Sequence, residues 1–313
     1  MTLLMLTLAC FQEKQNETKS LADGIVIDSN SQVWIFPPTR NRHEYKNTIP
    51  KELRKAKSLF LQDQVKEAAS ELLLQLDNNS ENPTIHSMLC ASYLRLQDMK
   101  QALKACQRTI EIAPTASHYS NLAVVYMAMG QSEEAIHFNQ RALALDGVFI
   151  PAYRNLSTLQ YKAGLLEDAS RTLLRFMQIK PFDNYAYIAY ANIQIEMGNT
   201  IEAEEILRYR ISNWENEGVP NPTERLHAEI PMLLSEILIK KRDHKDALFF
   251  ANMMEENARN STDMSQDIIV MSWRFRSHIL EKEQHPESNK WKEKIESYCK
   301  ENPIPSCQLK WGY

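Results

Sequence analysis

Apolar and polar residues follow one another along most of this chain with the spacing of amphipathic helices. Within residues 116–149, Leu122 and Ala123 belong to an apolar stripe whose members lie about one helical turn apart. Gly130 follows the stripe, where a residue in the left-handed conformation would end a helix. Ala135 then lies in a second amphipathic stretch. The pattern predicts a hairpin of two helices.

The same pattern returns about every 34 residues. In the stretch that begins at Ile150, Leu156, Gly164 and Ala169 stand where Leu122, Gly130 and Ala135 stand in the preceding one. Because one hairpin cannot bury its apolar stripe alone, we expect the copies to stack. The predicted units are residues 49–82, 83–115, 116–149, 150–183, 184–217 and 228–260, the first and last being the weakest copies.

This pattern resembles the tetratricopeptide repeat. The resemblance implies an all-α fold, a right-handed superhelical solenoid of about six helix hairpins with a concave face and with C-terminal capping helices. Four slots depart from the family pattern: Gln97 replaces the turn glycine, Phe176 and Arg210 replace small residues, and Pro231 occupies an apolar position. These departures leave the periodicity intact.

The chain outside the repeats divides into three parts. Residues 1–10 form a short apolar segment, and residues 11–48 are expected to be a tether or an irregular segment. Residues 261–313 are expected to form capping helices and a tail. Two amphipathic stretches in that region, 264–283 and 286–302, predict the helices.

The first ten residues, MTLLMLTLAC, resemble the signal of a bacterial lipoprotein, which is cut before a cysteine that then carries lipid. Leu8, Ala9 and Cys10 match the end of that signal, whereas Thr7 and the lack of a preceding Lys or Arg depart from it. The resemblance implies a lipid anchor at Cys10 and a place in the bacterial cell envelope, on the periplasmic side of the outer membrane. The alternative is an apolar tail with an ordinary cysteine on a cytoplasmic protein.

Four cysteines remain if Cys10 carries lipid, and an even number suits an oxidising compartment. The expected disulfides are Cys90–Cys106, within one repeat, and Cys299–Cys307, which would hold the tail against the last predicted helix. The alternative is four buried or free thiols.

Composition argues against several classes of function. The net charge of −4 offers no basic face for nucleic acid. Only 7 glycines occur, which disfavours a glycine-rich phosphate loop, and the 8 histidines lack the spacing of metal ligands. No catalytic motif is recognisable, so we expect neither an enzyme nor a cofactor.

The resemblance implies instead a protein or peptide partner bound in the concave groove. Asn121 and Asn155 share the sixth position of their units, where stacked asparagines in some family members hydrogen-bond a bound peptide. The alternative for both is ordinary hydrogen bonding between repeats. The predicted groove residues are Asn121, Val124, Met127, Arg154, Asn155, Thr158, Tyr161, Tyr185, Ile188 and Asn192.

We therefore expect a non-catalytic, membrane-tethered scaffold for protein–protein interaction, with a role in envelope assembly. Two alternatives are a cytoplasmic repeat adaptor or regulator and the repeat subunit of an enzyme complex.

Overall fold

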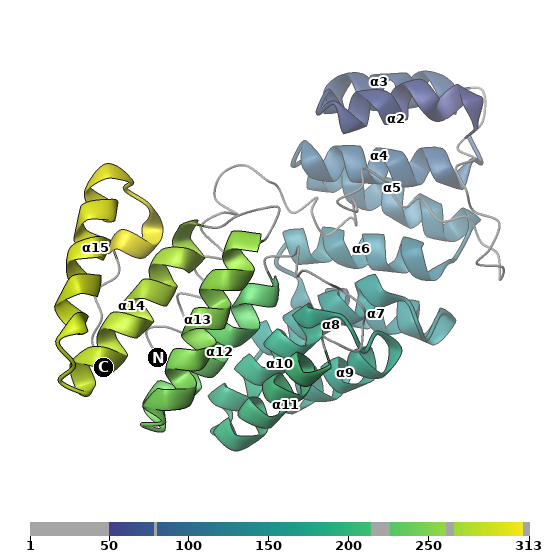
Figure 1. The fold of residues 1–313 in the computed structure, drawn as a ribbon. Helices are drawn as coiled ribbons and strands as arrows, with labels where there is room; N and C mark the ends of the chain where they lie inside the picture. Colours follow the sequence, from purple (N-terminus) through teal and green to yellow (C-terminus); the bar gives the residue numbers. More distant parts are fainter. Residues whose placement is uncertain (1–49, 78–79, 214–225, 261–265, 309–313) are drawn as a thin grey trace. The chain divides into compact units, whose positions relative to one another are not determined.

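A computed structural model describes residues 50–77, 80–213, 226–260 and 266–308 of the chain. In those residues the regular structure is helical, with fourteen α-helices and two short 3₁₀ helices (Figure 1). The predicted all-α architecture of consecutive helical hairpins is confirmed. Cys10, the tether of residues 11–48 and the end of the tail lie outside the described residues. The chain divides into two compact units, Met1–Thr172 and Leu173–Tyr313.

Unit one is a series of hairpins whose neighbouring helices pack against one another. Each helix begins and ends within a unit that the repeat pattern predicts. The helices are η2 (Lys51–Leu53), α2 (Arg54–Leu61), α3 (Val65–Leu76), α4 (Pro83–Arg95), α5 (Met99–Ile112), α6 (Ala116–Ala128), α7 (Ser132–Leu145), α8 (Ile150–Lys162) and α9 (Leu166–Ile179), which continues into unit two.

Unit two continues the series with three further hairpins. The helices are α10 (Asn184–Glu196), α11 (Thr200–Ser212), α12 (Leu226–Lys240), α13 (His244–Asn260), α14 (Gln266–Lys282), α15 (Glu287–Glu301) and η4 (Pro305–Gln308). The last pair, α14 and α15, corresponds to the two helices that the amphipathic stretches 264–283 and 286–302 predict.

One residue in the left-handed conformation lies between the two helices of every described hairpin. Gly130, Gly164 and Gly198 have φ of 75°, 74° and 85°, as expected for glycine. The other four turns use non-glycine residues in the same conformation: Asp63, Gln97, Arg242 and Gln284. Because the hydrogen bonds around these residues also repeat, the turn geometry is shared even where the glycine is not.

Small side chains occupy the crossing between the two helices of each repeat. Ala123 of α6 and Ala135 of α7 are both 0% exposed, which allows the two backbones to approach closely. The equivalent residues of the other predicted repeats are also buried: Ala56, Ala68, Cys90, Ala102, Ser157, Ala169, Ala191, Ala203, Ser235 and Ala247. The register predicted from the sequence therefore matches the packing.

Two large residues, Phe176 and Arg210, are buried where the repeat pattern has a small one. In unit two, the Arg210 guanidinium donates to the Phe182 carbonyl oxygen at 3.0 Å and lies 5.6 Å from the centre of the Tyr187 ring. Its charge is thus held against backbone oxygen and aromatic surface rather than in water. The repeat tolerates these departures because the surrounding residues provide matching contacts.

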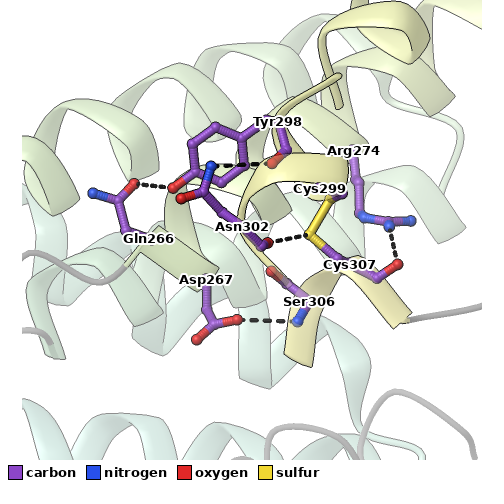
Figure 2. Close-up of a disulfide and its surroundings, with 8 residues drawn as sticks. All are labelled: Gln266, Asp267, Arg274, Tyr298, Cys299, Asn302, Ser306 and Cys307. Carbon is purple, nitrogen blue, oxygen red and sulfur yellow. Dashed lines mark hydrogen bonds between the residues drawn. A yellow bond between two sulfur atoms is a disulfide. The ribbon is translucent and has the colours of Figure 1, made fainter. Parts of the chain in front are cut away.

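The 3₁₀ helix η4 is fastened to the last hairpin by a disulfide and two hydrogen bonds, and a further hydrogen bond joins the two helices of that hairpin (Figure 2). Cys299 of α15 is bonded to Cys307 of η4. Arg274 of α14 donates to the Cys307 carbonyl oxygen at 3.0 Å, and the backbone N–H of Ser306 donates to Asp267 at 3.0 Å. Tyr298 donates to Gln266 at 2.9 Å. These contacts hold α15 and η4 against α14.

Candidate functional site

A row of amide and hydroxyl side chains joins the first helices of three successive repeats in unit one. The Nδ2 of Asn121 on α6 donates to the Ser87 hydroxyl on α4 at 3.5 Å. The Nδ2 of Asn155 on α8 donates to the Ser120 hydroxyl on α6 at 3.3 Å. We call Ser87, Ser120, Asn121 and Asn155 the amide–hydroxyl row. The serines and the asparagines each recur one repeat apart because the helices that carry them recur with that spacing.

The row is anchored in the interior at Ser120. The Ser120 hydroxyl donates to the Oδ1 of Asn139 on α7 at 3.3 Å, and the Nδ2 of Asn139 donates to the Ala135 carbonyl oxygen at 3.0 Å. Asn139 is 0% exposed, so these bonds satisfy a buried amide. Sequence reasoning did not identify Asn139 as a support for Asn155, although a lone asparagine on the apolar face of α7 was a possible signal.

The asparagine bonds support the structural interpretation of Asn121 and Asn155, as links between repeats. They do not use the whole amide, because both bonds are made by Nδ2. Each Oδ1 accepts no hydrogen bond from the described residues, and both side chains are half-buried. An amide offers a donor and an acceptor, so each side chain retains an acceptor for a backbone N–H of a bound peptide.

Most of the other residues predicted for unit one are accessible. Met127, Thr158 and Tyr161 are half-buried, and Arg154 is exposed. Val124 is different, because it is 1% exposed and packs in the apolar core formed by α2 to α6. Val124 is therefore a core residue, and we correct its prediction as a groove residue.

The predicted residues of unit two lie on α10. Tyr185, Ile188 and Asn192 are all half-buried. The Tyr185 ring centre lies 6.4 Å from that of Phe176, and Ile188 packs against the apolar core of unit two. The Oδ1 of Asn192 is buried and has no hydrogen-bond partner among the described residues. These side chains are therefore partly committed to the interior.

Ionisable groups with a shifted pKa lie in ion pairs or in the interior. Burial would raise the pKa of Glu204, but hydrogen bonds from Lys241 and Arg208 at 2.6 Å and 2.8 Å outweigh it and hold the pKa below its usual range. Burial lowers the pKa of His118. Across the described ranges, no group of three or more His, Cys, Asp or Glu side chains is arranged to hold a metal ion. None of the described helices is long and apolar enough to cross a membrane.

Comparison with known proteins agrees with this geometry. A family model described as tetratricopeptide repeat matches residues 81–147, the stretch that contains α4 to α7. Residues 81–147 of the chain therefore resemble tetratricopeptide repeats. Over 143 residues it is 27% identical to a tetratricopeptide repeat protein 21 homolog from Caenorhabditis briggsae. That match covers 45% of this chain and only 10% of the relative's length.

Solved structures with a similar fold cover most of this repeat chain. The C-terminal part of a repeat-containing protein from Cytophaga hutchinsonii has a TM-score of 0.62 and 14% identity, covering 81% of this chain and 96% of that one. Pseudomonas aeruginosa pilF has a TM-score of 0.52 and 16% identity, with 72% and 95% covered. PilW, a type IV pilus biogenesis factor, has a TM-score of 0.51 and 17% identity, with 68% and 94% covered. At these identities the likeness concerns the fold.

Proposed function

We propose that this chain is a non-catalytic scaffold that binds an extended peptide segment of a partner protein along the amide–hydroxyl row of unit one. The observation that carries the proposal is the row itself. Asn121 and Asn155 recur at one repeat spacing, and each presents a free acceptor while its Nδ2 holds it in place. A peptide backbone recognised in this way contributes main-chain hydrogen bonds, while Met127 and Tyr161 offer apolar contact at its side chains.

The lengths of the hydrogen bonds in the row support a role in binding besides the structural one. The Nδ2–Oγ distances of 3.5 Å and 3.3 Å are long for hydrogen bonds, so the links between repeats are weak ones. Weak links of this kind leave each side chain able to adjust toward a ligand that donates to Oδ1 while Nδ2 stays bonded. We also propose the predicted groove residues of α10, Tyr185, Ile188 and Asn192, as peptide contacts within unit two.

The test is capture of envelope proteins by the full chain, quantified for Asn121→Ala combined with Asn155→Ala. We expect capture of the specific partner to fall about tenfold, the effect of losing one or two backbone hydrogen bonds at a partly desolvated site. Gln107→Ala combined with Gln140→Ala is the matched control, because it removes two exposed amides from the second helices α5 and α7. Equal capture by both double variants, with equal helical melts, would overturn the proposal.

We further propose that the scaffold is tethered by lipid at Cys10 to a bacterial envelope membrane, with a role in envelope assembly. Two features support this: the lipoprotein-like end of the signal at Leu8, Ala9 and Cys10, and two disulfides, which persist in oxidising compartments. PilW illustrates that a similar fold occurs in a pilus biogenesis factor.

Mass spectrometry of the protein from native membranes tests the tether. A diacyl or triacyl group on Cys10 is the expected result. An unmodified Cys10 on protein recovered from the cytoplasm would exclude the tether and leave the cytoplasmic adaptor as the better description.

A further inference from the structure

Three helices of unit two bring cations and indole rings together in a way that the repeat pattern does not predict. The Lys294 ammonium nitrogen on α15 lies 4.0 Å from the ring centre of Trp273 on α14 and 4.4 Å from that of Trp291 on α15. The Arg276 guanidinium on α14 lies 4.9 Å from the Trp291 ring centre. With Arg259 and Glu255 of α13, these residues form what we call the cation–indole cluster.

The cluster holds more positive than negative charge. Glu255 uses both carboxylate oxygens, one paired with Arg259 at 2.7 Å and the other with Arg276 at 2.7 Å. Lys294 has no carboxylate partner within ion-pair distance in the part of the chain that the structure describes. Three cations against one carboxylate leave an excess of two positive charges in a region where Arg276 is only 13% exposed.

The excess charge is unfavourable for the protein alone. Burial lowers the pKa of Lys294, and although Glu255 opposes this, the nearby charges of Arg259, Arg276 and Lys290 lower it further. The Nε of Arg276 is buried and donates no hydrogen bond to the described residues. An anion placed beside these groups would relieve the repulsion and would gain strength from the reduced access of water.

We propose that the cation–indole cluster is a docking site for an acidic peptide segment, whose aspartate or glutamate side chains pair with Lys294 and Arg259. Both of these cations are exposed, so a carboxylate can reach them. A lipid surface is a poorer match because Trp273 is 5% exposed and Trp291 is half-buried beneath Lys294 and Arg276. Neither indole is free to enter a bilayer. This site lies in unit two and goes beyond the peptide binding proposed for unit one.

The test is an isothermal calorimetric titration of the full chain with a hexaglutamate peptide at low ionic strength, which measures the affinity. We expect Lys294→Gln to weaken binding about five- to tenfold, because the variant removes one ion pair from a partly desolvated site. Lys300→Gln is the matched control, since it removes the same charge from an exposed position on the same helix. The control should change the affinity less than about twofold, an effect typical of an exposed charge.

Arg259→Gln provides a second variant, because Arg276 continues to pair with Glu255 when Arg259 is replaced. It should weaken hexaglutamate binding to a similar extent. Equal affinities for Lys294→Gln and Lys300→Gln would overturn the proposal, as would no binding of hexaglutamate by the unmodified chain. Binding to vesicles that contain phosphatidylglycerol, with none to hexaglutamate, would also overturn it and would identify a lipid surface as the ligand.

Discussion

The two disulfides of this chain join helical hairpins in two different ways. Cys90 and Cys106 link α4 to α5 across the middle of a hairpin, and they are 0% and 1% exposed. Cys299 and Cys307 link the end of α15 to η4, and both are half-buried. The first bond lies where two helices already touch through small side chains. The second holds a short segment whose Ile304 and Cys307 are partly buried against the apolar core of unit two.

The difference indicates two roles for the same chemical bond. In α4 and α5, Cys90 and Ala102 stand where Ala123 and Ala135 stand in the next repeat, so the disulfide to Cys106 adds a covalent bond to this close contact. At η4, it works together with polar contacts from Arg274 and Asp267 to hold a single short turn against α14. We therefore expect the loss of the first bond to affect unit one as a whole, and the loss of the second to have a local effect.

The largest effect is expected for Cys90→Ala combined with Cys106→Ala. The bond closes a sequence separation of 16 residues, and restricting the unfolded chain by such a loop is worth about 3 kcal/mol. The free energy of unfolding of unit one, measured by urea denaturation, should fall by about that amount. No change would mean that the contact between α4 and α5 is sufficient without the bond.

A smaller and local effect is expected for Cys299→Ala combined with Cys307→Ala. Its sequence separation is 8 residues, so the stabilisation of the local segment is at most about 2.5 kcal/mol. Hydrogen exchange should increase in η4 and at the end of α15, while the helical melt of the rest of the chain should stay the same. A global loss of stability comparable to that of the Cys90 variant would contradict the distinction.

The smallest effect concerns the turns of the same two hairpins, which both contain glutamine. Gln97 and Gln284 have φ of 60° and 56°, a region that costs a side chain energy and glycine none. Gln97→Gly and Gln284→Gly should each raise the free energy of unfolding by about 0.5–1 kcal/mol. Gly130→Ala is the control in the opposite direction, since it should lower stability by a similar amount through strain, with no atoms within 4 Å to clash.

Repetition explains how much of the fold was predictable from the sequence. Ala135 has an equivalent in every unit, so its burial could be inferred from the pattern. The turn between two helices at Gly130 could be inferred in the same way. Arg210 could not be placed in this way, because a buried arginine depends on the Phe182 carbonyl oxygen and the Tyr187 ring, which come from another part of unit two. Such contacts follow from three-dimensional packing and have no periodic signal.

The candidate sites show the same limit. Asn121 and Asn155 were predictable as a pair because they repeat, but the choice of Ser87 and Ser120 as their partners depends on how far neighbouring helices are offset. Val124 was wrongly assigned to the groove. It lies near the edge of the apolar stripe of its helix, where the sequence does not show whether a side chain faces the core or the groove. The cation–indole cluster draws on α13 of the last predicted repeat and on α14 and α15, which follow the repeats. Nothing in the spacing of Lys294 or Arg276 therefore indicated it.

The order of the packing contacts has a consequence for the synthesis of the chain. In unit one, each helix from α2 to α7 packs against the helix before it and the helix after it. A hairpin leaving the ribosome therefore finds its packing partner already made, and it does not wait for distant sequence. Low contact order of this kind favours rapid folding. We infer that unit one can assemble hairpin by hairpin during translation. At each stage only the newest hairpin would expose an apolar face that the next hairpin later covers.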